Sequence, residues 1–234
     1  MKRVCVLTGA SGRLGAAFIE RCAATFRIVA IHHRRELSFP SQGQSFVDPL
    51  APSSPLPENA NAVHAIRADL SRQEQIDAVC VEVMGRFGRI DVLVNAAVHR
   101  TSSDLLAPNA LDGAEMALLV NVLAPLRLAA AFTHAFWSSR AEENVALRRH
   151  VLNVSSTCGV YVYPDLGQAV YSTTKAALNF ASYHMANDLF GIGVRANAVA
   201  PNTFPGLVST SRVVDEMLAL DASEDTGRLV VIDE

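Results

Sequence analysis

The sequence has few of the features that mark metal, disulfide-rich or nucleic-acid-binding proteins. Its 234 residues include only four cysteines, and these are scattered without CxxC or histidine spacing. This distribution suggests neither a zinc site nor a disulfide framework, and we predict no metal. There is no basic run, and the formal net charge is -3. We therefore expect no nucleic-acid partner.

Long uninterrupted apolar runs are also missing. The most apolar stretch, residues 116–137, contains Asn121, Pro125 and Arg127. It therefore lacks the roughly 18 apolar residues in a row that indicate a membrane span. We predict a packed helix there and no membrane partner. The N-terminus runs directly into a strand-like pattern without a secretory cleavage region, so we expect a cytoplasmic protein.

Half of the residues are hydrophobic, which suits one large core in a chain of this length. Strand-like segments alternate with helical patterns, and we predict strands at 3–7, 27–32, 63–67, 90–95, 150–154, 194–199 and 229–232. This alternation is typical of a parallel sheet with helices on both faces. We predict an α/β fold with a doubly wound parallel sheet in three α/β/α layers, as a single domain over residues 1–234. Ligands of such folds bind at the carboxyl ends of the strands.

A glycine-rich turn follows the first of these strands and leads into a helical pattern. Glycines at such a turn let backbone N–H groups approach a pyrophosphate, whose charge is favoured at the N-terminus of the next helix. Such a turn can also be purely structural. The dinucleotide interpretation makes cofactor-binding candidates of Gly9, Ser11, Gly12, Arg13, Leu14 and Gly15.

Tyr171 and Lys175 stand four residues apart in a helical pattern. At that spacing they share one helix face, so the ammonium can stabilise the tyrosine anion. A free phenol titrates near about 10, and a general acid works best when its pKa lies closer to the working pH. A tyrosine and a lysine at this spacing often occur together by chance. The order of the motifs favours catalysis, because Ser155 and Ser156 end the strand just upstream.

Together these motifs resemble the short-chain dehydrogenase/reductase family. The resemblance runs from Lys2 to about Asn202 and resumes weakly at Thr226. The matching pieces are TGASGRLG at 8–15, ADL at 68–70, DVLVNAA at 91–97, Asn121, NVSS at 153–156, YSTTK at 171–175 and RANAVAP at 195–201. It implies a Rossmann-type fold that binds a nicotinamide dinucleotide. A weaker similarity to pteridine reductases lies in the Arg-Leu-Gly ending of the turn and the His-Arg loop after the second strand.

The resemblance implies a catalytic role for each of four residues. Tyr171 would protonate the substrate carbonyl, and Ser156 would hydrogen-bond the same oxygen, with Ser155 as the alternative. Lys175 would lower the tyrosine pKa and hold the nicotinamide ribose. Asn121 would kink its helix and support a water chain to the lysine. Without the resemblance, an asparagine in an apolar helix would be interpreted as a buried amide with its hydrogen bonds satisfied.

The resemblance also implies further cofactor contacts. Asp69 and Leu70 would lie at the adenine, Asn95 and Ala96 in the loop above the cofactor, and Pro201 and Thr203 near the carboxamide. The cofactor type depends on the end of the second strand, where an acidic residue would favour NAD and a guanidinium the 2′-phosphate of NADP. His33 and Arg34 stand there, and with Arg13 they predict NADP (NADPH), with NAD less favoured. The alternative is that these arginines are ordinary solvated charges.

Three segments depart from the family pattern. Residues 38–62 hold five of the ten prolines, which predicts an irregular insertion, either inert or a lid over the dinucleotide. The Ser156 to Tyr171 spacing is about two residues longer than usual. Residues 203–225 leave room only for a shortened substrate flap.

The sequence thus predicts an NADP-dependent oxidoreductase that reduces a small-molecule carbonyl or oxidises an alcohol. We expect a substrate pocket lined by His99, Tyr161, Tyr163 and Phe204, with Cys158 either in that pocket or a structural thiol. A biosynthetic enzyme for dehydration, isomerisation or cyclisation, or a non-catalytic NADP(H) sensor, remains open. The family resemblance also implies a homodimer or homotetramer.

Overall fold

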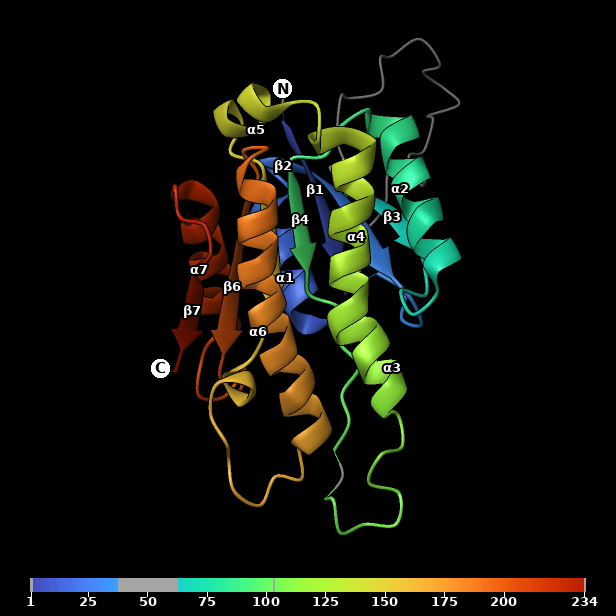
Figure 1. Cartoon of the computed structure of the whole chain (residues 1–234), viewed down its shortest axis with the longest axis vertical. Helices are drawn as coiled ribbons and strands as arrows, with labels where there is room; N and C mark the ends of the chain where they lie inside the picture. The colour runs from blue at the N-terminus through green and yellow to red at the C-terminus, as the bar shows by residue number, and fades with distance from the viewer. Residues whose placement is uncertain (1, 38–62, 103, 234) are drawn as a thin grey trace, which may run out of the picture.

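The computed structural model describes residues 2–37, 63–102 and 104–233. Within these residues seven strands form one parallel sheet in the order β3-β2-β1-β4-β5-β6-β7 (Figure 1). The strands are β1 (Arg3–Thr8), β2 (Phe26–His32), β3 (Val63–Arg67), β4 (Val92–Asn95), β5 (His150–Val154), β6 (Arg195–Pro201) and β7 (Leu229–Ile232). The predicted α/β fold with a parallel sheet is confirmed. The proposed insertion at 38–62 lies outside the described residues.

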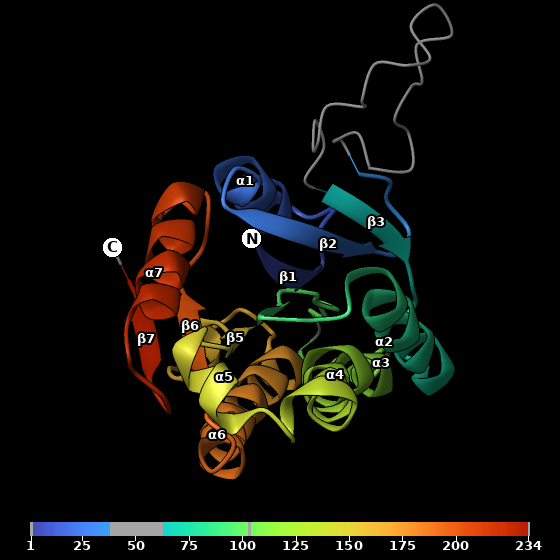
Figure 2. The same ribbon diagram turned by 90° about the horizontal axis from the view of Figure 1, so that it is seen from above.

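Helices cover both faces of the sheet, which gives the three predicted layers (Figure 2). One face carries α1 and α7, and the other carries α2, α4 and α6. The helices are α1 (Arg13–Cys22), α2 (Gln73–Phe87), α3 (Ala114–Leu118), α4 (Ala124–Phe132), α5 (Ala141–Ala146), α6 (Ala169–Phe190) and α7 (Thr210–Ala222). All strands run the same way, so their carboxyl ends form a single edge.

Successive strand residues point to opposite layers, because side chains alternate along a β-strand. In β1, Val4 and Val6 join the core under α2, α4 and α6, whereas Cys5 and Leu7 join the core under α1 and α7. Both faces are buried, which explains why the strands appear in the sequence as continuous apolar runs.

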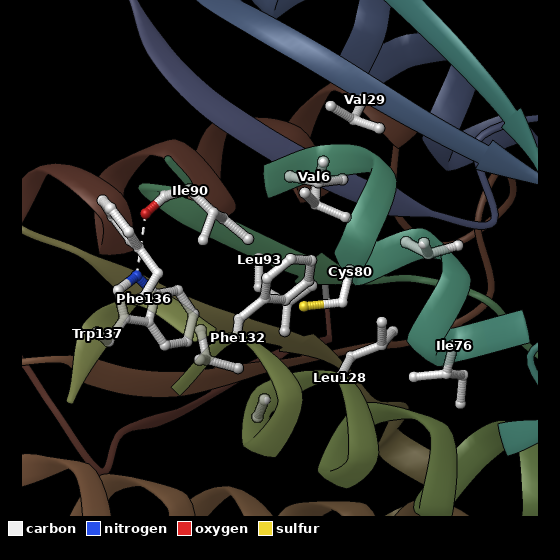
Figure 3. Close-up of a cluster of buried hydrophobic side chains, with 14 of the residues drawn as sticks. Val6, Val29, Ile76, Cys80, Ile90, Leu93, Leu128, Phe132, Phe136 and Trp137 are labelled. Carbon is white, nitrogen blue, oxygen red and sulfur yellow. Dashed lines mark hydrogen bonds between the residues drawn. The ribbon is translucent and has the colours of Figure 1, made fainter. Parts of the chain in front are cut away.

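The larger core contains the only tryptophan of the chain (Figure 3). Trp137 is fully buried beside Phe132, with ring centroids 6.3 Å apart. Its indole Nε1 donates a hydrogen bond to the backbone oxygen of Ile90, at 3.0 Å. This bond satisfies the polar atom of an otherwise apolar side chain.

The apolar stretch predicted as a packed helix forms α3, η2 (Leu119–Leu123), α4 and η3 (Thr133–Trp137) in succession. By length and composition alone this 24-residue helix, Ala114–Trp137, could cross a membrane, with a mean hydropathy of 1.7. However, Leu128, Phe132 and Trp137 are completely buried in the larger core. The segment therefore packs one side against the sheet, as predicted for a packed helix. The π-helical η2 contains Asn121, and single π turns of this kind often occur at functional sites.

The segment after β6 differs from a substrate flap. Most of residues 203–225 form α7, whose Val213, Val214 and Met217 pack in the second core. Only residues 202–209 connect β6 to α7. The shortened flap expected there is thus reduced to this connection, because α7 is needed to cover the sheet.

Candidate active site

The glycine-rich turn packs directly against the loop that follows β4. Gly9 has a φ of +68°, and a Cβ placed on it would lie 2.7 Å from the backbone oxygen of Ala96. A Cβ on Gly15 would lie 2.6 Å from the backbone oxygen of Gly9. Neither position can carry a side chain without moving backbone. The glycine turn and the loop after β4 are therefore in direct contact. The N-terminus of α1, capped by Gly12, begins at this turn, and a helix N-terminus favours a bound anion.

Thr8 joins the same two loops, and sequence reasoning assigned it no role. Its hydroxyl accepts hydrogen bonds from the backbone N–H groups of Ala96 and Ala97, both at 3.0 Å. The side chain is buried at the end of β1. Thr8 therefore fixes the distance between the glycine turn and the loop after β4.

A cavity of about 510 Å³ opens at the carboxyl ends of β1, β2 and β4. Eight of the predicted cofactor-binding residues line it: Gly9, Ser11, Gly12, His33, Arg34, Asp69, Leu70 and Ala96. His99 also lines it. The structure thus brings together residues that are up to about ninety positions apart in the chain, as Rossmann-type sheets do at their carboxyl edge.

Asp69 is already engaged within this cavity. Its Oδ1 accepts hydrogen bonds from the backbone N–H and the hydroxyl of Ser71, at 3.0 and 2.7 Å. Its Oδ2 lies 3.9 Å from His33 Nε2. Burial by itself would raise the pKa of Asp69, but the Ser71 hydrogen bonds and then His33 lower it overall. Asp69 is therefore a fixed carboxylate acceptor.

A second cavity of about 290 Å³ adjoins the first and shares Gly9, Gly12, Ala96, Val98 and Arg100 with it. Its remaining lining includes five residues of the predicted turn and catalytic set, Arg13, Leu14, Gly15, Tyr171 and Lys175, together with Ser155, Val154 and Phe204. The glycine turn and the tyrosine–lysine pair therefore face one space.

Tyr171 sits near the start of α6 and is only 6% exposed. Burial raises the pKa of its phenol, and two neighbours oppose this effect, first the Arg100 guanidinium and then a hydrogen bond with Ser156. The guanidinium carbon of Arg100 lies 5.5 Å from the centroid of the tyrosine ring. The net result is a raised pKa, so the phenol keeps its proton at neutral pH.

Lys175 is buried one turn further along α6. Its Nζ donates a hydrogen bond to the backbone oxygen of Val154 at 2.8 Å and lies 5.9 Å from the Tyr171 ring centroid. Burial, followed by the positive charge of Arg100, lowers the pKa of Lys175 to about 7. The sequence predicted that Lys175 lowers the pKa of Tyr171. In the structure the cation that lowers this pKa is Arg100.

Ser156 lies two residues after the end of β5 and caps a short 3₁₀ turn, η4 (Thr157–Gly159). Its Oγ accepts a hydrogen bond from the backbone N–H of Cys158, at 3.2 Å. The hydroxyl of Ser155 instead donates to the backbone oxygen of Lys175, at 3.2 Å, and so is used in holding α6 against β5. Of the two serines, Ser156 is the one that bonds to Tyr171.

Asn121 clamps the loop after β4. Its Oδ1 accepts from the backbone N–H of His99 at 2.8 Å, and its Nδ2 donates to the His99 backbone oxygen at 2.9 Å. The same Nδ2 donates to the hydroxyl of Thr174 at 3.0 Å, which in turn donates to the Tyr171 backbone oxygen at 2.7 Å. One buried amide therefore ties this loop to the helix that carries Tyr171.

Comparison with known proteins decides the family. A family model described as short chain dehydrogenase matches residues 3–217. The chain belongs to the short-chain dehydrogenase family. Members of this family are oxidoreductases that bind a nicotinamide cofactor.

Relatives and solved structures agree with this assignment. The chain is 28% identical to a farnesol dehydrogenase of Aedes aegypti over 98% of its own length and 88% of the relative. A short-chain dehydrogenase of Leptospira borgpetersenii with bound NAD+ has a TM-score of 0.80 at 17% identity, over 100% of this chain and 92% of that one. The Pseudomonas aeruginosa RhlG/NADP complex has a TM-score of 0.78 at 19% identity, over 99% and 94%.

The residues present fit the cofactor of a short-chain dehydrogenase. The turn at Gly9 and Gly15 is closed to side chains, the N-terminus of α1 faces it, and two adjoining cavities extend from it toward Asp69 and toward Tyr171. A dinucleotide has the length to extend over both. Among the described residues, no group of three His, Cys, Asp or Glu side chains is placed to hold a metal ion.

Several predicted residues lie outside these cavity walls. Asn95 is buried and donates to Asn153 Oδ1 at 2.9 Å, so it joins β4 to β5. Thr203 is exposed, and the neighbouring Phe204 lines the second cavity. The remaining predicted residues missing from both walls are Asn121, Ser156, Pro201, Tyr161, Tyr163 and Cys158.

The two arginines expected at the 2′-phosphate also lie apart. Arg34 lines the larger cavity, whereas Arg13 lines the smaller one at the start of α1. The sequence placed them together because both flank the expected cofactor, but the first residue of α1 is directed toward the catalytic end.

Proposed function

We propose that the protein is an NADPH-dependent carbonyl reductase in which Tyr171 is the general acid. The observation that carries the proposal is the buried pair of Tyr171 and Lys175 in the wall of a cavity that also contains the glycine turn, with the buried Ser156 acting on the tyrosine from behind that wall. A non-catalytic sensor would need the turn but not this set.

The reduced nicotinamide supplies a hydride to the carbonyl carbon when the cofactor is bound. Tyr171 donates its phenolic proton to the carbonyl oxygen, so that one hydride and one proton convert the carbonyl to an alcohol. Ser156 shares a hydrogen bond with the tyrosine and orients the same oxygen. Lys175 holds α6 against β5 through its hydrogen bond to Val154. In its charged form it would stabilise the negative charge that Tyr171 carries after it has given up its proton.

The proton state of Tyr171 favours reduction over oxidation. Because the phenol pKa is raised, the neutral, proton-donating form predominates at neutral pH. Oxidation of an alcohol would need the phenolate as a base, which becomes available only at higher pH.

We propose NADP(H) as the cofactor on the basis of charge at the end of β2. His33, Arg34 and Arg35 line the larger cavity there. The residues between β2 and the end of the described segment at 37 include one carboxylate, Glu36, which is not in the cavity wall. A guanidinium at this place suits a 2′-phosphate.

Replacing Arg34 with glutamate should weaken NADPH binding by about 10- to 100-fold, as expected for loss of a hydrogen bond to a charged group. NADH affinity should change much less, since NADH has no 2′-phosphate. Titration of nicotinamide fluorescence gives both dissociation constants. Arg86→Glu, an exposed site on α2, is the charge-matched control. Equal losses for NADPH and NADH in Arg34→Glu would contradict the NADP assignment.

The activity itself is tested with the purified protein, NADPH and a panel of ketones, quinones and pterins, by loss of nicotinamide absorbance. Oxidation of NADPH by any panel member, with formation of the alcohol, supports the reductase. Tight NADPH binding without turnover of any panel member would favour a sensor, and failure to bind either dinucleotide would overturn the proposal.

We also propose that copies of the chain associate through α4 and α6, which lie side by side on one face (Figure 1). The helical segment from α3 to α4 exposes Leu118, Leu123 and Leu126, and α6 exposes Phe180, Tyr183 and Phe190. Burial of such a patch against its copy would stabilise a homodimer or homotetramer. Light scattering should give two or four times the chain mass of 25.1 kDa; a monomer at micromolar concentration would contradict it.

A cytoplasmic setting suits the four free cysteines, since thiols stay reduced there. Cell fractionation tests this assignment, and recovery of the protein with membranes or secreted material would overturn it.

A further inference from the structure

Arg100 occupies the boundary between the two cavities. It follows β4 by five positions in the sequence and is the sole arginine found in both cavity walls. Its guanidinium carbon lies 5.5 Å from the centroid of the Tyr171 ring. An exposed cation therefore lies beside the proton donor.

The charge around Arg100 is unbalanced. Among the described residues, the smaller cavity is lined by the cations Arg13, Arg100 and Lys175 and by no carboxylate. The one carboxylate that the described part of the chain places in the larger cavity is Asp69, which is bonded to Ser71 and lies near His33. The ion pairs of the described residues join other arginines to acids, and Arg100 is in none of them. Within the described ranges, Arg100 thus adds positive charge to the cavity and has no carboxylate partner.

The other two cations have evident tasks. Arg13 is the first residue of α1, next to the turn that suits the cofactor pyrophosphate. Lys175 is 3% exposed and donates to Val154. Arg100 is an exposed residue of the cavity wall, and among the described residues its one ring contact is with Tyr171.

The backbone leading to Arg100 is held in place. Asn121 bonds both the N–H and the oxygen of His99, the residue just before it. Since the same amide is bonded to Thr174 on α6, the loop is fixed relative to Tyr171. Recognition groups held on fixed backbone lose less entropy when they bind a ligand.

We infer that Arg100 is a substrate-binding residue that selects carbonyl compounds carrying a carboxylate. This inference rests on the proposed reductase function and names the class of its substrate. The planar guanidinium binds a carboxylate through two parallel hydrogen bonds, which would direct the carbonyl end of an oxo acid toward Tyr171.

The test compares two oxo acids, 4-oxopentanoate and 4-acetylbenzoate, with their uncharged methyl esters. Binding is measured by calorimetry, with and without NADP+, so that no turnover occurs. We expect each acid to bind the wild-type protein at least about tenfold more tightly than its ester, as for one charge-assisted hydrogen-bonded pair. In Arg100→Met this preference should fall to about one, through weaker acid binding and unchanged ester binding.

Two controls separate charge, shape and folding. Arg86→Met, on the exposed face of α2, should keep the full acid preference, and circular dichroism should show the same fold for all variants. Arg100→Lys keeps the charge but loses the two-pronged geometry, so it should retain only part of the preference. No binding of the acids to the wild type, equal binding of acid and ester, or an unchanged preference in Arg100→Met would overturn the inference.

Turnover with NADPH is followed separately for the same compounds. Reduction of acids and esters at equal efficiency would support the reductase and overturn the role of Arg100. Acid-selective binding that depends on Arg100, without any NADPH oxidation, would instead support the anion site and contradict the reductase.

Discussion

Tyr171→Phe is expected to lower kcat/KM for carbonyl reduction by about 10²- to 10⁴-fold, the usual contribution of a positioned general acid. The phenol is the buried proton donor in the cavity wall, and phenylalanine fills the same space without a proton to give. The dissociation constant for NADPH should stay within about twofold, because the ring remains and only the hydroxyl is lost. Steady-state rates and fluorescence titration of the same preparation measure the two quantities.

Tyr183→Phe provides the matched control. Tyr183 lies on the same helix, α6, but 42% of it is exposed on the outer face. It should leave both rate and affinity unchanged. If Tyr171→Phe kept at least a third of the wild-type kcat/KM, Tyr171 could not be the general acid, whatever its position.

The strands and the glycine turn were predictable because their signals are local. Continuous apolar runs such as residues 150–154 are required wherever both faces of a strand are buried, and β5 occupies those residues. Gly9 and Gly15 are similarly constrained, since the structure leaves no room for a Cβ at either position. A local sequence pattern is enough to predict a feature when only one backbone geometry is compatible with that pattern.

The rest of the site depends on contacts that no local pattern encodes. Arg100 is one arginine among many until the fold places it 5.5 Å from the Tyr171 ring, 71 positions later in the chain. Burial of Lys175 lowers its own pKa to about 7, whereas the YxxxK spacing predicted a fully charged ammonium beside the phenol. Desolvation is a property of the folded interior, so it could not be predicted from the spacing of the two residues.

A second buried network was also invisible in the sequence, and it lies at the opposite edge of the sheet. Asp91 and Arg149 are completely buried and joined by a hydrogen bond of 3.2 Å between Arg149 Nε and Asp91 Oδ1, across 58 positions of sequence. Asp91 also accepts from Arg89 and from the backbone N–H of Val4. These residues precede β4 and β5, at the amino ends of the strands. The network therefore concerns stability and not catalysis.

Asp91→Ala should reduce the free energy of unfolding by about 3–5 kcal/mol, because it removes the buried carboxylate that accepts from Arg149 and from Val4 and leaves Arg149 with only the half-exposed Glu143 as its ionic partner. Urea unfolding at fixed protein concentration, followed by fluorescence of the buried Trp137, measures this loss. Asp188→Ala, an exposed site on α6, should change stability by less than about 0.5 kcal/mol.

The double variant Asp91→Ala/Arg149→Met should be less destabilised than the two single losses added together, since it removes both charges at once. A loss below about 1 kcal/mol in Asp91→Ala would show that the network is dispensable. The folded fraction of Asp91→Ala should keep the wild-type kcat, because the network and Tyr171 lie at opposite ends of the strands; the two substitutions thus separate the stability of the sheet from the chemistry at its carboxyl edge.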